Sequence, residues 1–351
     1  MPENEIDGAN GGRIRQAISN ARKRRQPTGM QYAFADRIAF LNVEHWDDVA
    51  QGQSIFLSRA YLQVEQETGH ADLLRRYCLI YRDELPVAAF VTRTLEITGD
   101  QLVAEQHALS DSDRKQLNLK ALGRKALKNF RRRVMICGNL ISWGAHGVAF
   151  RAGEDPVALW PAIAEGIYRL RRSDRLMGQT DYVVVKDLPD SLSKTAEPLS
   201  QFSYRRVATE PDMVLKLRPE WESFDGYLDS LNKKYRKAAK TVCGVFQGDE
   251  FTIQRLSDVG STAPAMFDLY RQVASRAGVR LAGLTPEYLP TLASTLGEDH
   301  FAVTGIFRGE DLIGWVSSIR DGGTSIGYYL GLDYTVNESH PVYHRLLYAV
   351  I

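Results

Sequence analysis

Residues 301–319 read Phe-Ala-Val-Thr-Gly-Ile-Phe-Arg-Gly-Glu-Asp-Leu-Ile-Gly-Trp-Val-Ser-Ser-Ile, and this stretch decides the class of fold. Two runs rich in β-branched and aromatic residues flank a turn sequence that begins at Arg308, so the stretch predicts a β-hairpin. A second turn at Asp321-Gly-Gly leads into a further predicted strand at Thr324–Leu332. Apolar spacing predicts helices around this hairpin, at Ala265–Ala277, Pro286–Leu296 and from Tyr343 to Ile351. The combination indicates an α/β domain.

The same order occurs in the first half of the chain. A helix opened by Ser58 precedes a hairpin of Tyr77–Tyr81 and Val87–Leu95, and a buried strand is predicted at Val134–Trp143. This is a duplicated α/β unit rather than a solenoid, because its period is far longer than ~50 residues. For 351 residues, a prior of ~150 residues per domain also gives two domains. We expect a disordered basic arm at 1–30, a first domain at 31–200 and a second at 201–351.

Composition excludes several classes of protein. Lys and Arg number 44 against 43 Asp and Glu, so a net charge of +1 demands no nucleic-acid partner. The three cysteines show no CxxC spacing, which argues against a zinc site and favours reduced thiols in the cytoplasm. No apolar run approaches the ~18 residues of a membrane span. We therefore expect a cytoplasmic protein with no metal.

Two stretches are locally basic. Residues 114–133 hold nine Lys and Arg and no acid, on a predicted helix. A second predicted helix places apolar residues on one face and cations on the other. The apolar face is Phe224, Leu228, Leu231, Tyr235, Ala238 and Val242, and the cations are Lys233, Lys234, Arg236, Lys237 and Lys240. We expect these helices to bind an anionic partner such as tRNA or a lipid head group; the alternative is a solvated helix face.

Several segments together resemble a known family. They are Glu44-His-Trp-Asp, Cys137-Gly-Asn-Leu, Met213-Val-Leu-Lys-Leu-Arg-Pro-Glu-Trp, Tyr227-Leu-x-x-Leu-x-x-Lys-Tyr-Arg, Gly331-Leu-Asp-Tyr and Tyr343-x-x-Leu-Leu-Tyr. The chain resembles the tandem-GNAT, FemAB-like acyl and aminoacyltransferases that form peptidoglycan bridges. The resemblance covers nearly all of the chain after about residue 40. It implies an α/β fold of two GNAT-like domains.

The chain departs from that family in two places. The family continues beyond the position of Ile351 with two more strands, so the resemblance implies that the second domain is incomplete and lacks one wall of its donor slot. An unpaired edge after Thr324–Leu332 would then invite self-association. A GNAT pyrophosphate loop is glycine-rich, whereas the matching stretch here, from Tyr334 to Pro341, has no glycine and carries Glu338.

The resemblance also implies a site at the end of the predicted strand Thr324–Leu332. In the GNAT mechanism a backbone N–H of the fourth strand polarises the donor carbonyl, and a nearby side chain manages protons. The available catalytic groups are Asp333, His340 and Tyr329, and the expected substrate-binding residues are Tyr328, Asn337, Lys233, Lys234 and Arg236. The alternative is a strand of packed tyrosines followed by a polar loop in which Asn337 and Ser339 cap a helix.

The equivalent strand end in the first half is Gly138-Asn-Leu-Ile-Ser-Trp-Gly-Ala-His-Gly. Gly144 and Gly147 allow the backbone to approach a ligand, and His146 is a possible base. The favoured interpretation is a glycine-permitted turn with a surface histidine. His340 and His344 lie four residues apart and are more simply explained as a loop and surface pair than as metal ligands.

The sequence therefore predicts transfer of an acyl or aminoacyl group from a thioester or ester donor to an amine. The donor is expected to be acyl-CoA or aminoacyl-tRNA, and the acceptor a small molecule or a cell-wall precursor. The reaction needs positioning, one general base and an oxyanion-stabilising N–H, without a metal. The alternative is a non-catalytic binding or scaffold protein built on a degenerate transferase fold.

Overall fold

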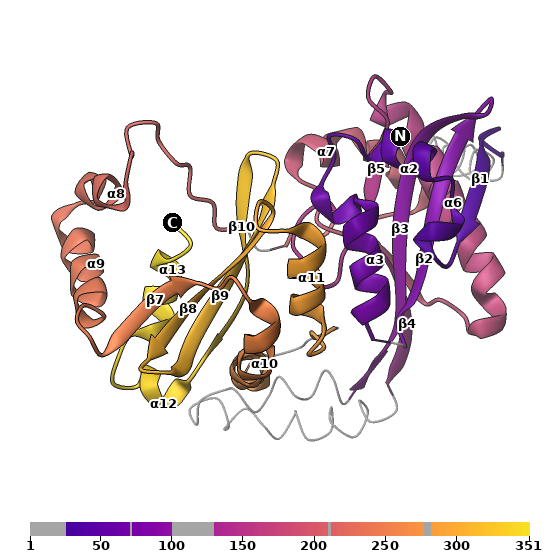
Figure 1. Cartoon of the computed structure of the whole chain (residues 1–351). Coiled ribbons are helices and arrows are strands. Elements are labelled where there is room, and N and C mark those ends of the chain that lie inside the picture. The colour runs from indigo at the N-terminus through magenta and orange to yellow at the C-terminus, as the bar shows by residue number, and fades with distance from the viewer. Residues whose placement is uncertain (1–25, 71, 100–129, 210–211, 277–281) are drawn as a thin grey trace, which may run out of the picture. The chain divides into compact units, whose positions relative to one another are not determined.

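The computed structural model describes residues 26–70, 72–99, 130–209, 212–276 and 282–351 (Figure 1). Residues 1–25 of the predicted arm and residues 114–129 of the first basic stretch lie outside the described residues. The chain divides into two compact units. The first comprises the described parts of Met1–Arg59, Asp72–Glu96 and Arg132–Thr209, and the second those of Ala60–Ala71, Ile97–Arg131 and Glu210–Ile351. The second unit thus takes a segment from the first half of the chain.

The first unit contains one mixed sheet with helices. Its strands run in the order β1-β2-β3-β4-β6, with β5 paired to β3 beside this path. The pairs β1–β2, β2–β3 and β3–β5 are antiparallel, and β4 and β6 pair in parallel. The strands are β1 (Gln31–Ala35), β2 (Leu74–Arg82), β3 (Leu85–Thr98), β4 (Arg131–Cys137), β5 (Val148–Phe150) and β6 (Tyr182–Val185). The helices are α2 (Val43–Ala50), α6 (Pro156–Ser173) and α7 (Asp190–Thr195), with short 3-10 turns η1 (Ile38–Phe40), η2 (Ile55–Leu57), η5 (Asp174–Met177) and η6 (Glu197–Phe202).

The predicted first hairpin is confirmed as β2 and β3. Its two-residue loop is Asp83 and Glu84, both with positive φ (46° and 68°). Loops of this kind match the twist of the flanking strands. The loop sets Arg82 opposite Leu85, and a shift of register between Tyr81 and Ile80 then places Cys78 opposite Phe90.

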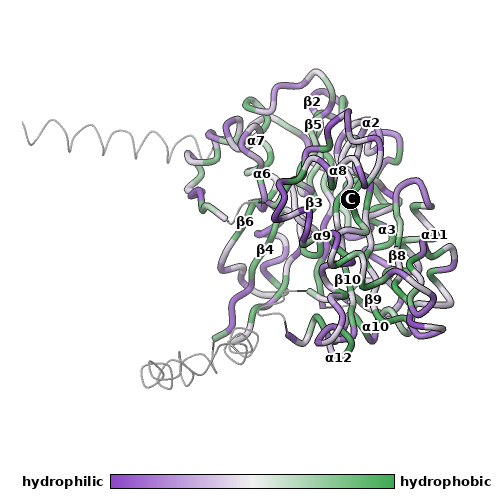
Figure 2. Tube along the Cα trace, turned by 90° about the vertical axis from the view of Figure 1, so that its left-hand side faces the viewer, coloured by the Kyte–Doolittle hydropathy of each residue, from purple (hydrophilic) through white to green (hydrophobic). Residues whose placement is uncertain are grey.

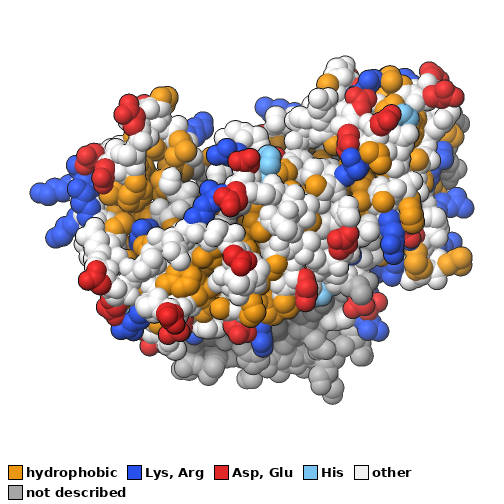
Figure 3. Space-filling view, in the orientation of Figure 1, with side chains coloured by type: hydrophobic (Ala, Val, Ile, Leu, Met, Phe, Trp, Pro, Cys, Tyr) orange, Lys and Arg blue, Asp and Glu red, His pale blue; other side chains and the backbone are white. Residues whose placement is uncertain are grey.

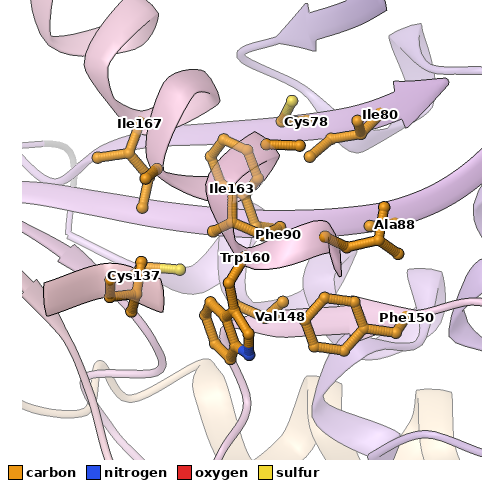
Figure 4. Packing of buried hydrophobic residues seen from close by; sticks show 14 of the residues in the cluster. Cys78, Ile80, Ala88, Phe90, Cys137, Val148, Phe150, Trp160, Ile163 and Ile167 are labelled. Carbon is orange, nitrogen blue, oxygen red and sulfur yellow. The ribbon is translucent and has the colours of Figure 1, made fainter. Parts of the chain in front are cut away.

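The core of the first unit forms where α6 packs on the sheet. Figure 4 shows Trp160, Ile163 and Ile167 of α6 over side chains of β2, β3 and β5. The Trp160 ring meets Phe150 edge-on at 5.3 Å, and its Nε1 donates to Thr195 Oγ1 at 3.0 Å. Burial of each such large side chain contributes about 1.5–3 kcal/mol. Asp155 caps the helix and Pro156 occupies its first turn, as its sequence predicts.

The second unit contains a four-stranded antiparallel sheet in the order β10-β9-β8-β7. Figure 1 shows α10 and α11 beside this sheet. Its strands are β7 (Phe251–Arg255), β8 (Phe301–Arg308), β9 (Asp311–Asp321) and β10 (Thr324–Leu332). Its helices are α3 (Arg59–Thr68), α8 (Phe224–Ser230), α9 (Lys233–Val245), α10 (Val259–Arg276), α11 (Tyr288–Leu296), α12 (Tyr334–Asn337) and α13 (Val342–Tyr348). The hairpin at residues 301–319 and the third strand are thus confirmed.

The two sheets share one strand order. In each, four strands follow one another along the chain and across the sheet, and two helices separate the first strand from the second in sequence. By this order β4 and β10 occupy the same position, as predicted for Val134–Trp143 and Thr324–Leu332. The fold is therefore mixed α/β in both units.

Three local predictions are wrong. The helix predicted across residues 224–242 is two helices, because Leu231 is extended (ψ 147°) and Asn232 caps α9 by accepting a hydrogen bond from Tyr235 N at 3.2 Å. The apolar pattern Met-Val-Leu-Lys-Leu at residues 213–217 also predicts a strand, but these residues pair with no strand in the described part of the chain, and Met213 is 98% exposed. The strand predicted to run to Trp143 ends at Cys137 instead, and it begins at Arg131, within the stretch predicted as a helix.

Hydropathy along the chain follows these elements. In Figure 2 hydrophobic and hydrophilic positions are interspersed along the tube. In the second unit Trp315 is fully buried on β9 and donates from Nε1 to the carbonyl of Met266 at 2.9 Å, which ties α10 to the sheet. Among the described helices, none combines the length and the apolar character that a membrane span requires.

Candidate functional site

The carboxyl ends of β4 and β6 bring together a set of polar side chains in the first unit. These strands run parallel, with Val134 opposite Tyr182 and Cys137 opposite Val185. The pairing closes where Lys186 N donates to the Cys137 carbonyl at 2.9 Å. In sheets with parallel strands, ligands bind beyond the carboxyl ends. The residues that follow these two strands are therefore the first place to look for chemistry.

His146 is the centre of this set. It is only 5% exposed, which corrects the prediction of a surface histidine. Its Nδ1 lies 2.7 Å from Ser54 Oγ, and its Nε2 lies 2.5 Å from the Trp143 carbonyl oxygen. Because a carbonyl only accepts, Nε2 carries a proton, and in the neutral ring Nδ1 accepts from the Ser54 hydroxyl. The result is a series of two hydrogen bonds, in which Ser54 donates to His146 and His146 donates to the Trp143 carbonyl.

The surroundings fix the orientation of the His146 ring. The ring stacks on Phe56 with centroids 4.2 Å apart, and Ser54 Oγ also accepts from Phe56 N at 3.2 Å as the cap of η2. Gly144 has φ +115°, and a Cβ there would lie 2.5 Å from His146 Nε2. Only glycine leaves room for the ring at this point. Ser54 is partly exposed, so of the hydrogen-bonded residues Ser54, His146 and Trp143 it offers the side-chain oxygen that a substrate can reach.

A second polar group follows β6. Lys186 Nζ pairs with Asp187 Oδ2, donates to the Ser142 carbonyl at 3.0 Å and lies 5.1 Å from the centre of the Trp143 ring. Asp187 Oδ2 also accepts from Gly144 N at 3.2 Å. Trp143 itself is 71% exposed. This group joins the loop after β4 to the segment after β6.

Buried Arg93 supports the same loop. It is fully buried on β3, and its Nη1 donates to the Gly138 carbonyl at 2.6 Å. Asn139 is also fully buried, and its Oδ1 accepts from Ile141 N at 2.9 Å. Each hydrogen bond offsets the cost of burying a polar group. The loop is therefore held from several directions, as a preorganised site requires.

An open groove of about 2030 Å³ adjoins these residues. It is lined by α6, by residues 181–188 and by residues 196–209, all of which belong to the first unit. Lys186 and Asp187 belong both to the groove and to the polar group after β6. The polar residues at the strand ends therefore border a space large enough for a ligand.

In the second unit, predicted residue Tyr328 lies in a triangle of tyrosine hydroxyls. Tyr288 donates to Tyr61 at 3.1 Å, and Tyr328 lies 2.6 Å from Tyr288 and 3.2 Å from Tyr61. Each hydroxyl has one proton, so Tyr328 donates to Tyr288 and Tyr61 donates to Tyr328. Burial raises the pKa of both Tyr288 and Tyr328 well above the ordinary value. The triangle joins α3, α11 and β10 with neutral phenols.

Tyr329 lies at a bulge of β10. The register with β9 shifts between Gly327 and Leu330, so one extra residue stands opposite Ser317. The fully buried Ser317 hydroxyl donates to the Tyr329 carbonyl and accepts from Tyr329 N, each at 3.0 Å. The Tyr329 ring packs edge-on against Tyr270 at 5.8 Å. This backbone N–H therefore already has a partner within the sheet.

The polar residues after β10 take part in local capping. Asp333 caps α12, accepting from Thr335 N at 2.8 Å and from Thr335 Oγ1 at 2.7 Å. Partial burial acts to raise the pKa of Asp333, but these hydrogen bonds outweigh it and the pKa is lowered. Asn337 Oδ1 accepts from Tyr343 N at 2.9 Å. His340 Nδ1 lies 2.9 Å from Ser339 Oγ, so Asp333 and His340 bond different neighbours.

The basic helix α9 presents its cations to solvent. Figure 3 shows Lys and Arg side chains gathered in the region of α8 and α9. Lys233 and Lys234 are exposed, and Arg236 pairs with Asp229 at 3.4 Å. Leu228 is buried as predicted, but Tyr235 is 59% exposed, so the prediction of its burial is wrong. Among the described residues of α9, Ala239 is the buried one.

The chain is similar to solved structures of known proteins. The solved structure described as "Crystal structure of FemX" matches 91% of this chain and 84% of its own, with 8% identity and a TM-score of 0.49. No protein-family model matches the chain, and no curated protein matches it.

The two strand ends differ in the chemistry that they offer. The first unit provides a partly exposed hydroxyl hydrogen-bonded to a histidine that a third group orients, which is the arrangement of a proton-transfer site. Within the described chain, no cluster of three or more His, Cys, Asp or Glu side chains is placed to hold a metal ion. Sequence reasoning considered His146 but missed Ser54, Lys186 and Asp187. The Lys-Asp pair directly after an apolar strand was the available signal, whereas nothing marked Ser54.

Proposed function

We propose that the protein is an N-acyltransferase that moves an acyl or aminoacyl group from a thioester or ester donor to an amine, at the carboxyl ends of β4 and β6. One observation carries the proposal: the hydrogen bonds that link Ser54 Oγ to His146 and His146 to the Trp143 carbonyl. The groove beside Lys186 and Asp187 supports it by offering space for substrates. The shared strand order of the two units is compatible with two GNAT-like domains.

The reaction would proceed by direct attack of the amine on the donor carbonyl. A C–N bond forms, and the C–S or C–O bond to the donor breaks. Ser54 accepts the proton that the amine loses and passes its own proton to His146 Nδ1. The resulting imidazolium is held by the Trp143 carbonyl, and it returns the proton through Ser54 Oγ to the departing thiolate or alkoxide. Such general acid–base catalysis contributes about 10²–10⁴-fold to a rate.

The structure offers no typical pyrophosphate cradle for the donor at α6. The first turn of α6 is capped by the Asp155 carboxylate, which accepts from Val157 N at 2.9 Å. The neighbouring Glu154 pairs with Arg82 at 3.0 Å. Negative charge at this terminus would repel a phosphate. We therefore define the donor only as a thioester or an ester. Acyl-CoA and aminoacyl-tRNA are the two forms to test.

The proposal is tested by single-turnover transfer assays with labelled acetyl-CoA, longer acyl-CoA and aminoacyl-tRNA, each with a mixture of primary amines. We expect amide product with one donor class, and a loss of about 10²–10⁴-fold in His146→Gln. Ser54→Ala should give a similar loss, and the double variant should lose no more than the larger single loss, since the two act as a unit. Absence of product with every donor, together with tight binding of a ligand, would favour a non-catalytic binding protein.

The alternative of a binding or scaffold protein has its own support in the second unit. There the predicted site residues serve packing and capping: Tyr328 in the hydroxyl triangle, Asp333 at α12 and Asn337 at α13. Exposed cations on α9 would then be the functional surface, binding tRNA or an anionic lipid head group. Salt-dependent binding by wild type, without transfer, is the result expected from this alternative.

A further inference from the structure

The groove of the first unit follows the outer edge of β6. Residues 181–188 all line it without interruption. Successive side chains of a strand point to opposite faces of its sheet, so a groove over one face would meet only alternate residues. Consecutive residues of a strand all contribute backbone atoms to its hydrogen-bonding edge. The groove therefore runs along the backbone of β6.

That edge is open for pairing within the part of the chain that the structure describes. β6 ends the strand order, with β4 as its one neighbour. Its sequence Tyr-Val-Val-Val holds no charge and no proline, which are two of the devices that protect an edge strand. Tyr182 is 58% exposed and Val184 is 42% exposed. An edge of this kind can accept an extended strand through main-chain hydrogen bonds, with side chains giving selectivity.

Charge around the groove selects the partner. Arg171, Arg172, Arg205 and Arg206 line it, are exposed and make no ion pair among the described residues. Three of the groove acids are already engaged: Glu165 with Arg169 at 2.6 Å, Asp181 with Arg133 N at 2.8 Å, and Asp187 with Lys186. Because a backbone N–H carries no charge, Asp181 keeps its own, so Asp181, Asp190 and Glu197 stand against the four arginines and the groove keeps an excess of one positive charge. The groove therefore favours an anionic ligand, and guanidinium groups pair well with carboxylates.

We infer that this groove binds an extended acidic peptide segment, which adds as a strand to the free edge of β6 while its carboxylates pair with the four arginines. The peptide backbone satisfies the edge, its alternate apolar side chains pack beside Tyr182 and Val184, and its acidic side chains face the arginines. The peptide uses the backbone of β6 and needs neither Ser54 nor His146, but it occupies part of the groove in which the transfer proposal places substrates.

The test uses a labelled seven-residue peptide, Thr-Glu-Val-Glu-Thr-Glu-Val, and fluorescence anisotropy at low and high salt. Two further versions carry N-methyl groups on one or the other set of alternate residues. A strand added to an edge turns only one set of N–H groups toward it. We expect one version to bind about tenfold weaker or worse and the other within about twofold of the parent. A version with Lys in place of Glu should not bind measurably.

Protein variants locate the site. Arg205→Gln with Arg206→Gln should weaken binding about tenfold and reduce its salt dependence. Arg175→Gln is the matched control, because Arg175 is exposed in the same unit but does not line the groove. His146→Gln should bind the peptide as wild type does although it loses transfer. Peptide binding and transfer can therefore fail separately, and the two proposals are distinguished.

Three results would overturn the inference. Equal binding of both N-methylated versions would show that the backbone edge is not used. Displacement of the peptide by pyrophosphate, with no effect of N-methylation, would make the groove a phosphate site. Absence of peptide binding together with concentration-dependent dimers in light scattering would assign the edge to a second copy of the chain.

Discussion

The strands β4 and β10 hold the same place in their sheets but end in opposite ways. β4 ends in a loop where a histidine bonds a partly exposed serine and a backbone carbonyl, beside an open groove. β10 ends among tyrosines whose hydroxyls bond one another, and in an aspartate that caps the next helix. The same strand order therefore occurs with two different strand ends. At the end of β4 a polar group stays accessible, whereas at the end of β10 the polar groups bond one another or cap a helix.

The difference follows from what covers each strand end. In the second unit α3 brings Tyr61 against α11 and β10, and the Ser317 side chain fills the β10 bulge. In the first unit the loop after β4 is held by Arg93, Gly144 and the Lys186–Asp187 pair, which fix its backbone without closing it over Ser54. A buried network that is fully hydrogen-bonded gives rigidity, whereas chemistry needs one member that solvent can reach.

The largest change in stability is expected at Gly331 of β10. A Cβ there would lie 2.6 Å from Tyr270 N and 2.8 Å from the Leu269 carbonyl carbon, so the backbone of α10 would have to move. Gly331→Ala should lower the free energy of unfolding by about 3 kcal/mol, at the upper end of overpacking effects. Urea unfolding measures it, with Gly323→Ala as the control because no atom lies within 4 Å of a Cβ there. Equal stability of the two variants would show that α10 does not pack on β10 as described.

The hydroxyl triangle predicts the next effect. Tyr288→Phe removes a donor and an acceptor from a buried ring of hydrogen bonds, so that Tyr61 and Tyr328 each lose one hydrogen bond. We expect a loss of about 1–3 kcal/mol. Tyr343→Phe, at an exposed position, should change stability by less than about 0.5 kcal/mol. If both variants unfold at the wild-type denaturant midpoint, the tyrosines of the second unit are free for chemistry and the contrast between the units weakens.

The cap at Asp333 predicts a smaller effect with a distinct pH dependence. Its pKa is lowered in the folded protein, so its stabilisation is present at pH values above the unfolded pKa of about 3.9 and is lost as pH falls through the folded pKa. Asp333→Ala should cost about 0.5–2 kcal/mol at pH 7. The cost should shrink toward zero in acid. A difference that stays constant from pH 7 to pH 2 would contradict the assignment of Asp333 as an ionised cap.

The smallest effect is expected on α9. Lys233, Lys234 and Lys237 are exposed and make no ion pair among the described residues, and Arg236 makes one long pair. Changing the four to Gln should shift the melting temperature by no more than a few degrees, because exposed charges contribute little. Binding to tRNA or to vesicles with anionic lipid, if present in wild type, should fall and should weaken with salt. A drop of more than about 10 °C would instead indicate a structural role for these cations.

Local patterns in the sequence predicted most of the fold. The hairpin at residues 301–319 and the strand at Thr324–Leu332 both depend on neighbouring residues, and both are confirmed. The break at Asn232 was also local, but apolar spacing across residues 224–242 outweighed it in the prediction. Exposure of Tyr235 could not be predicted, since periodicity identifies an apolar face without saying what covers it.

The candidate site in the first unit depends on contacts between distant residues, which local sequence patterns do not indicate. Ser54 and His146 are 92 positions apart, and Tyr61 and Tyr328 are 267 apart. Nothing in either local sequence indicates the partner. The tyrosines of β10 attracted a catalytic interpretation because their own stretch is polar and aromatic, while the helix that covers them comes from the other half of the chain.

The measurement that separates the two units most directly is a crossed pair of variants, His146→Gln and Tyr328→Phe, each assayed for transfer and for unfolding. We expect His146→Gln to lose about 10²–10⁴-fold in transfer while its unfolding midpoint changes little. Tyr328→Phe should keep transfer within about threefold of wild type and lose about 1–3 kcal/mol of stability. The reverse result, with transfer lost in Tyr328→Phe and kept in His146→Gln, would place the reaction in the second unit and contradict the assignment to Ser54 and His146.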